Sequence, residues 1–132
     1  MVVGLRDLVA AGAGAAFGVG SGELTRRVGS RQALIAGALG LVTAAVIYPA
    51  ARRSFGTGGV AAELGAVAAT TGLGLAASRL DSAIGRQLVA AGWAAHVLFD
   101  TLQGPSEDSR LPDWYPALCA GYDVAYAAQL VR

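Results

Sequence analysis

Residues 33–51 read ALIAGALGLVTAAVIYPAA, nineteen consecutive residues without a charged side chain. A helix rises ~1.5 Å per residue, and about 20 apolar residues are needed to cross the hydrocarbon core of a bilayer. Tyr48 and the pair Arg52 and Arg53 mark the end of the stretch, where aromatic and basic side chains suit the headgroup region. This segment therefore predicts a transmembrane helix.

The composition of the whole chain agrees with this interpretation. The 132 residues are 55% hydrophobic and 14% charged. Soluble domains are about 45–50% apolar and about 25% charged. The length allows a single domain, residues 1–132. We therefore expect a membrane protein of one domain.

Four further apolar segments flank this stretch, separated by polar, glycine-rich or proline-containing turns. The predicted fold is all-α: a polytopic membrane bundle of five transmembrane helices, or four if the first or fourth lies flat or re-enters. The expected helices cover residues of about 3–24, 33–51, 55–78, 82–102 and 114–131.

Three glycines in the first segment, Gly14, Gly18 and Gly22, recur at intervals of four. Small residues at this spacing allow two membrane helices to approach closely. Because glycine is abundant throughout the chain, the spacing could equally be without consequence.

With five spans, six arginines fall on one side of the bilayer and four on the other. The positive-inside rule then places the N-terminus outside, in a multi-pass protein of the cell membrane. The same topology puts Glu63, His96 and Asp123 in one half of the bilayer, toward the second and fourth loops.

Ionisable residues inside apolar segments are costly, and their default interpretation is functional. The candidate catalytic residues are Asp100, Asp123, His96 and Glu63. His96 and Asp100 share a helix face, and the next helix presents Asp123. Consecutive helices joined by a short loop are usually neighbours, so His96 and Asp123 could come within hydrogen-bond reach.

Aromatic side chains share these helix faces and could shape a substrate pocket. The candidate substrate-binding residues are Trp93, Tyr115, Tyr122, Tyr126 and Tyr48.

Each candidate also has a structural interpretation. Asp123 could merely satisfy His96 or Arg86 as a structural pair, and Glu63 could likewise be structural. His96 could bond a backbone carbonyl, and Asp100 could cap the following loop. The aromatic residues could simply pack or lie at the membrane interface, and Cys119 is typical of a small apolar filler.

Several classes of chemistry have no matching motif. One histidine without HExxH is a weak metal signal, so we expect no metal. There is no phosphate-binding loop, dinucleotide fingerprint or Gly-x-Ser-x-Gly elbow, and we expect no cofactor. A net charge of +1 gives no indication of a basic surface that would bind nucleic acid. A single cysteine excludes an internal disulfide.

The C-terminal motifs carry a family resemblance. An H-x-x-x-D motif (His96, Asp100), a linker and W-Y-P-x-x-C-x-x-x-D (residues 114–123) follow one another. This arrangement resembles the C-terminal signature of small integral membrane proteins common in actinobacterial genomes. The resemblance covers about the last 40 residues. It implies a membrane location and a special C-terminal helix pair, and implies no particular reaction.

Once metal and cofactor chemistry are set aside, the chemistry that these residues support is proton transfer. Carboxylates in a dry pocket, with a histidine and tyrosine hydroxyls, suit acid/base reactions of an apolar substrate. We expect a cofactor-independent enzyme that opens an epoxide (hydrolase or cyclase type) on a polyketide or isoprenoid in biosynthesis, or isomerises a double bond. Small membrane-bound epoxide hydrolases and cyclases are similar in that they carry acidic residues inside a helical bundle.

Two other functions stay open. A proton-coupled transporter working as a homodimer would use Glu63 or Asp123 to bind a proton and a substrate alternately. An assembly or interaction subunit would use the same residues only to specify helix packing.

Overall fold

The computed structural model describes residues 3–56 and 58–132, and over these residues it forms helices without a β-strand. The helices are α1 (Leu5–Arg27), α2 (Ser30–Ala50), α3 (Val60–Ser78), α4 (Ser82–Leu102) and α5 (Tyr115–Leu130). An all-α fold was expected from the sequence, and the bounds of α4 are those predicted.

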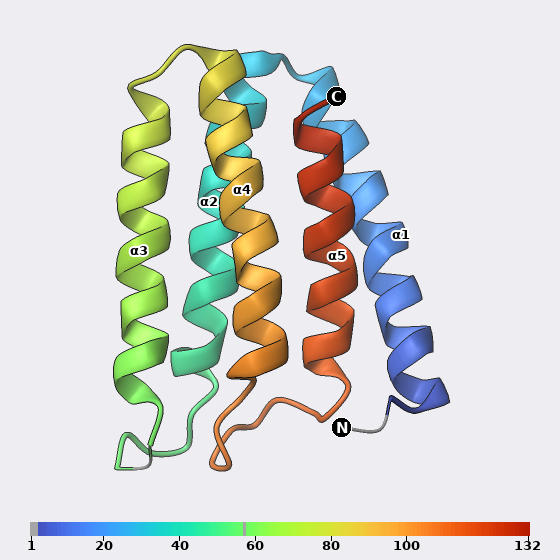
Figure 1. Ribbon diagram of the computed structural model, residues 1–132, viewed down its shortest axis with the longest axis vertical. Coiled ribbons are helices and arrows are strands. Elements are labelled where there is room, and N and C mark those ends of the chain that lie inside the picture. Colours follow the sequence, from blue (N-terminus) through green and yellow to red (C-terminus); the bar gives the residue numbers. More distant parts are fainter. Residues whose placement is uncertain (1–2, 57) are drawn as a thin grey trace.

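The helices stand side by side in an up-and-down bundle (Figure 1). The contacts of α4 are with α2, α3 and α5, whereas α1 packs almost entirely on α5. The α2–α3 and α4–α5 connections lie at one end of the bundle, and the α1–α2 and α3–α4 connections lie at the other.

The expectation of five transmembrane spans is wrong. In the described part of the chain only α2 and α3 are long and apolar enough to cross a membrane. α5 has 16 residues, which is too short, and α1 and α4 are interrupted by charged residues such as Glu23 and Arg86. Runs of alanine and glycine look apolar by composition, but they contribute too little hydropathy to offset these charges.

The two candidate spans are exposed on much of their surface. Only 33% of the apolar window of α2 and 17% of that of α3 is buried inside the bundle. The core helix of a soluble protein would be mostly buried, so these two helices are compatible with a membrane location.

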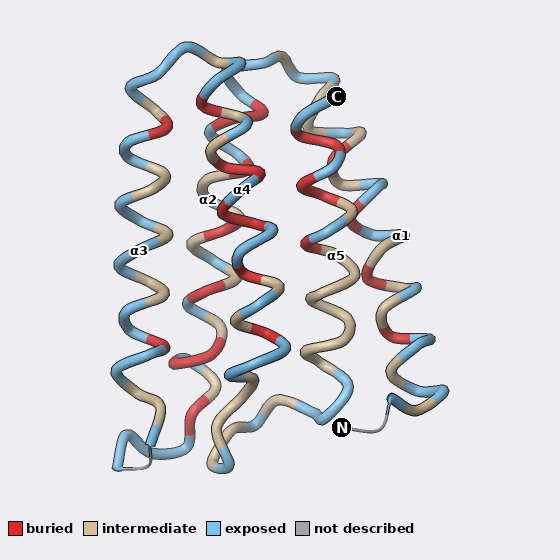
Figure 2. The backbone as a smooth tube through the Cα atoms, viewed as in Figure 1, coloured by how far each residue is buried: buried red, intermediate tan, exposed pale blue. Residues whose placement is uncertain are grey.

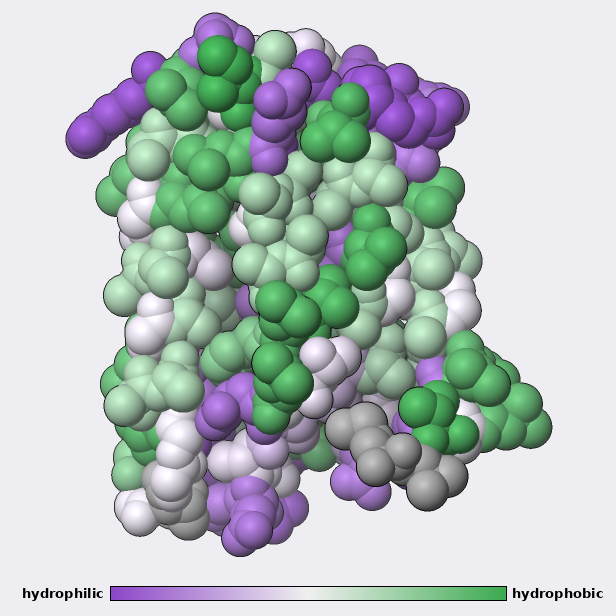
Figure 3. Space-filling model, viewed as in Figure 1, coloured by the Kyte–Doolittle hydropathy of each residue, from purple (hydrophilic) through white to green (hydrophobic). Residues whose placement is uncertain are grey.

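Large apolar side chains also lie on the outside of the other helices. Examples are Phe17 (67% exposed) on α1, Leu98 (61%) on α4 and Val124 (57%) on α5. The space-filling view shows apolar residues along the sides of the bundle and hydrophilic ones mainly toward its ends (Figure 3).

The core lies where α2, α4 and α5 face one another (Figure 2). Its buried members include Leu34 and Leu41 from α2, Val89 and Trp93 from α4, and Leu130 from α5.

The third helix begins at Val60, five residues later than the expected start. Gly59 precedes it with a φ of +87°, a left-handed conformation that glycine adopts without strain. The chain before it is tied to the α4–α5 connection, because the amide of Arg53 donates to the carbonyl of Asp108 and that of Arg110 donates to the carbonyl of Ala51.

The glycines of α1 form the contact with α5. A Cβ atom added to Gly14 would lie 1.9 Å from the carbonyl oxygen of Leu118, and one added to Gly18 would lie 2.5 Å from that of Tyr122. The contact is reciprocal, because a Cβ on Gly121 would lie 2.0 Å from the carbonyl oxygen of Ala11. The close helix approach suggested by the glycine spacing is confirmed.

A Gly14→Ala substitution should therefore destabilise the protein, by about 1–3 kcal/mol, because the new methyl group overlaps the α5 backbone. The matched control is Gly12→Ala, where an added Cβ meets nothing within 4 Å. This control should be neutral or more stable by up to about 1 kcal/mol, since alanine favours helix. Thermal unfolding in detergent measures both variants, and equal melting temperatures would contradict the packing described.

Candidate functional site

Four buried polar residues meet inside the bundle and form what we call the polar cluster: Tyr48 from α2, His96 and Asp100 from α4, and Asp123 from α5. Each is at most 4% exposed. Burying polar and charged groups is unfavourable unless they are paired, so the contacts within the cluster decide what it can do.

The imidazole of His96 is the centre of the cluster. Its Nδ1 lies 2.9 Å from Oδ2 of Asp123 and 3.4 Å from Oδ2 of Asp100. The hydroxyl of Tyr48 donates a hydrogen bond to Oδ1 of Asp100. The expected contact between His96 and Asp123 is therefore confirmed, and α2, α4 and α5 are joined by one chain of polar contacts.

Local structure explains these positions. Asp81 caps α4, accepting hydrogen bonds from the amides of Ala83 and Ile84, and so helps to fix where the helix begins. From there the i, i+4 spacing sets His96 and Asp100 on one face. Pro116 in the first turn of α5 is tolerated because the first amides of a helix have no partner within it.

The two carboxylates favour a positive charge on His96. Burial lowers the pKa of His96, but its contacts with the carboxylates of Asp100 and Asp123 outweigh burial and raise the value to about 9. Burial raises the pKa of Asp123 to about 6, against the opposing hydrogen bond from His96. A positively charged His96 is therefore favoured near neutral pH.

Two atoms of the cluster have no hydrogen-bond partner among the described residues: Nε2 of His96 and Oδ2 of Asp100. Buried polar atoms of native proteins are nearly always paired, so such an exception needs an explanation. A free Nε2 is the arrangement expected of a group that transfers a proton.

A groove of about 180 Å³ between α3 and α4 borders His96. It is lined by Ala66, Ala69, Thr70, Leu73, Gly92, Ala95, His96 and Phe99. His96 is the one ionisable residue of this lining, and the other walls are almost wholly apolar. The groove suits an apolar ligand that meets a single proton donor or acceptor.

Asp100 borders a second and larger cavity of about 570 Å³. This cavity lies between the first turns of α1, the α4–α5 connection and the start of α5, and its lining includes Asp7, Asp113 and Pro116. The polar cluster therefore contributes residues to two separate hollows.

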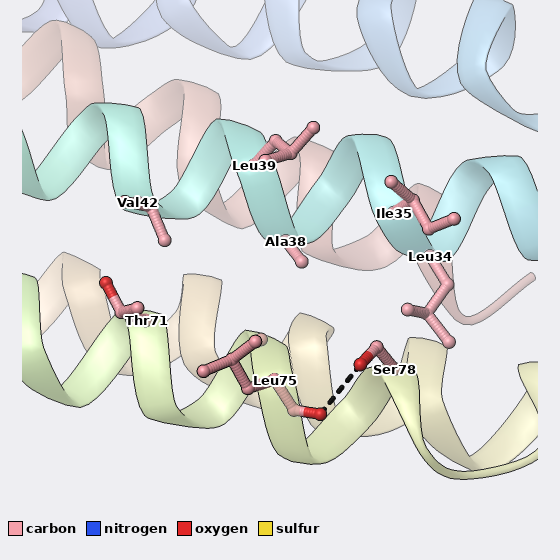
Figure 4. Close-up of a pocket in the computed structure, with 9 residues that line it drawn as sticks. Leu34, Ile35, Ala38, Leu39, Val42, Thr71, Leu75 and Ser78 are labelled. Carbon is pink, nitrogen blue, oxygen red and sulfur yellow. Dashed lines mark hydrogen bonds between the residues drawn. The ribbon is translucent and has the colours of Figure 1, made fainter.

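A third hollow, of about 280 Å³ between α2 and α3, contains no titratable side chain. Figure 4 shows it lined by Leu34, Ala38, Leu75 and similar residues, and its Ser78 hydroxyl is already bonded to the carbonyl of Leu75. It offers apolar contact but no reactive group.

Glu63 lies apart from the polar cluster. Its carboxylate is 2.5 Å from Nε of Arg52, and both side chains are at most 1% exposed. Arg52 also donates to the carbonyl of Gly58. This buried ion pair fixes the start of α3, whereas the sequence placed Arg52 at the membrane surface. In the sequence, only one feature pointed to this ion pair: an arginine and an acid lie eleven residues apart, on either side of a glycine-rich turn.

The predicted pocket aromatics separate into two groups. Trp93, Tyr122 and Tyr126 pack together, with ring centroids 5.0–5.7 Å apart, and belong to the core or pack against it. The indole of Trp93 donates to the carbonyl of Gly37. None of these three residues lines a hollow described above.

Tyr115 belongs to the second group, with its ring 6.1 Å from that of Tyr48 beside the polar cluster. Cys119 is close by, and burial raises its pKa to about 12, so it remains a thiol. Neither residue lines the groove at His96.

The ligand atoms of His96, Asp100 and Asp123 lie within 4.8 Å of one another, a spacing that could hold a metal ion. However, the 2.9 Å between Nδ1 and Oδ2 is an ordinary hydrogen-bond length. A proton between these two atoms accounts for the separation without a cation.

The Arg52–Glu63 pair provides a test of its structural role. Arg52→Met or Glu63→Leu alone should cost about 3–5 kcal/mol of stability, because each leaves an uncompensated buried charge. The double variant should recover much of that loss. Chemical unfolding of the three variants measures this, and additive losses in the double variant would show that the two residues act independently.

The chain matches no protein-family model, no curated protein and no solved structure. The resemblance to actinobacterial membrane proteins therefore stays a prediction. Function has to be inferred from the geometry of the polar cluster and the hollows beside it.

Proposed function

We propose that this chain is a membrane-associated enzyme that opens an epoxide in a lipophilic substrate by acid/base chemistry, without a cofactor. One observation carries the proposal. His96 is held through Nδ1 by Asp123 at 2.9 Å, while its buried Nε2 is unpartnered and the residue borders an apolar groove. A histidine oriented by a carboxylate through one nitrogen and free at the other is an established arrangement for proton transfer.

The reaction can proceed with one proton carrier. The imidazolium donates the proton on Nε2 to the epoxide oxygen as one carbon–oxygen bond of the ring breaks. Water, or a hydroxyl of the substrate, forms a new bond to the carbon released. That nucleophile returns its proton to Nε2, so the imidazolium is restored and no proton is gained or lost.

The other members of the cluster have supporting roles in this scheme. Asp123 holds the imidazole ring and stabilises its charged form. Asp100 adds a second negative charge at 3.4 Å. The Tyr48 hydroxyl, by donating to Asp100, fixes that carboxylate beside the histidine.

The groove limits what can enter. Its volume of about 180 Å³ is below the ~300–1,000 Å³ of pockets that enclose a drug-sized ligand. An epoxide-bearing end of an isoprenoid or polyketide would fit, with the remaining chain outside. Isomerisation of a double bond, in which one group removes and returns a proton, is the nearest related reaction.

For the location we propose the cell membrane, crossed by α2 and α3. Arg26, Arg27, Arg31 and Arg79 flank one end of this helix pair, and Arg52 and Arg53 lie between the helices at the other. The positive-inside rule then puts the first end in the cytoplasm. The start of α1, at the opposite end, would face outside.

Proton-coupled transport is the second candidate. The observation that favours it is the position of Asp100, which borders the larger cavity while its neighbour His96 borders the groove. Transport predicts substrate-dependent proton flux in liposomes, abolished by Asp123→Asn, and no chemical change in the substrate.

Turnover of lipophilic epoxides by the purified protein tests the enzyme. His96→Gln and Asp123→Asn should each lower it by at least about 10²-fold, the contribution typical of a positioned acid or base. The matched control is Asp81→Asn at the far end of α4, where asparagine caps the helix as well as aspartate. Turnover that survives both cluster variants would refute the assignment, and a loss of wild-type turnover in a metal chelator would refute cofactor independence.

The pH profile tests which form of His96 acts. Turnover should fall above pH about 9, because His96 then loses the proton that it donates, and below about 6, because Asp123 is then protonated. Asp100→Asn removes a carboxylate that raises the pKa of His96, so it should move the upper limb of the profile to lower pH. An upper limb that does not move would contradict the role given to Asp100.

A further inference from the structure

The charged residues are divided unequally between the two ends of the bundle. We call the end formed by the α1–α2 and α3–α4 connections and the C-terminal end of α5 the arginine end. It carries six arginines and two carboxylates, a formal charge of +4: Arg26, Arg27, Arg31, Arg79, Arg86, Arg132, Glu23 and Asp81.

The opposite end has the opposite sign. It carries four arginines and six carboxylates, a formal charge of −2: Arg6, Arg52, Arg53, Arg110, Asp7, Glu63, Asp100, Glu107, Asp108 and Asp113. The remaining acid is Asp123, inside the bundle. The net charge of +1 therefore conceals a strong difference in charge along the bundle.

Some arginines of the positive end are fixed to helix ends. Arg31 donates to the carbonyls of Ser78 and Leu80, and Arg86 donates to the carbonyl of Leu130. Others are exposed. The side chain of Arg27 is 71% exposed and pairs only at 3.5 Å with Glu23, and Arg79 is also exposed.

Exposed apolar side chains lie directly beside these arginines. Leu24 is 66% exposed, Val28 59%, Ile84 53% and Val131 56%. A band of guanidinium groups next to exposed aliphatic groups matches the boundary between headgroups and acyl chains in a bilayer. A nucleic acid or an acidic protein would match the charge but would leave this apolar surface in water.

We infer that the arginine end binds the headgroups of anionic phospholipids. Guanidinium groups pair with phosphate through two parallel hydrogen bonds, and each basic residue near an anionic surface strengthens binding by about fivefold. The inference rests on the membrane location proposed above, and it is independent of the reaction at His96.

The experiment compares wild type with two double variants. Arg27→Gln with Arg79→Gln removes two exposed charges from the arginine end. Arg53→Gln with Arg110→Gln is the matched control, because it removes two exposed arginines from the other end. Each protein is reconstituted into vesicles of phosphatidylcholine alone or of equal parts phosphatidylcholine and phosphatidylglycerol. Flotation reports association, and mass spectrometry reports the lipids retained after mild extraction.

Wild type should retain phosphatidylglycerol in clear excess over phosphatidylcholine, and high salt should reduce the excess. The Arg27 and Arg79 variant should lose this preference by about fivefold for each arginine, whereas the Arg53 and Arg110 variant should keep it. Equal retention of both lipids by wild type, or equal losses in the two variants, would overturn the inference. Absence of flotation with either vesicle would overturn the membrane location as well, and turnover of a soluble epoxide would still be measurable.

Discussion

The hydrogen bond between Nδ1 of His96 and Oδ2 of Asp123 fixes how α4 and α5 face each other. In a low-dielectric interior neither group tolerates being left unpaired, so the rotation of both helices is constrained at this point. The bond from Tyr48 to Asp100 extends the constraint to α2. α5 presents Asp123 to α4, and it presents the backbone of Leu118 and Tyr122 to the glycines of α1. The polar cluster and the glycine contact therefore share one helix.

The features predicted correctly are those that depend on periodicity within a helix. Spacings of four placed His96 with Asp100 and aligned the glycines of α1. The succession of α4 and α5 along the chain made them neighbours, although twelve residues separate them. These inferences use local geometry and chain order, which hold whatever surrounds the bundle. The contact of His96 with Asp123 was predicted by combining helix periodicity with the order of the helices along the chain.

The features predicted incorrectly depend on total hydropathy or on the folding of loops. Alanine and glycine made five segments look long enough for a bilayer, whereas only α2 and α3 combine sufficient length and apolarity. The start of α3 and the partner of Glu63 were missed for a related reason. Both depend on Gly59 at positive φ and on Arg52 turned inward, and no periodic pattern in the sequence predicts either feature.

The two buried acidic sites of the bundle differ in a way that separates structure from chemistry. Glu63 and Arg52 balance each other in charge, and the pair lines none of the three hollows described above. The polar cluster places two carboxylates on one imidazole. It leaves Nε2 of His96 without a hydrogen-bond partner and Oδ2 of Asp100 with only the 3.4 Å ion-pair contact to Nδ1, and each residue borders a hollow. Each unpaired buried polar group costs about 1–3 kcal/mol of stability, so the cluster is less favourable for stability than the Arg52–Glu63 pair. The unequal number of acids and bases in the cluster, together with its unpaired Nε2, is therefore the reason to assign the chemistry to His96 and to treat Glu63 as a structural residue.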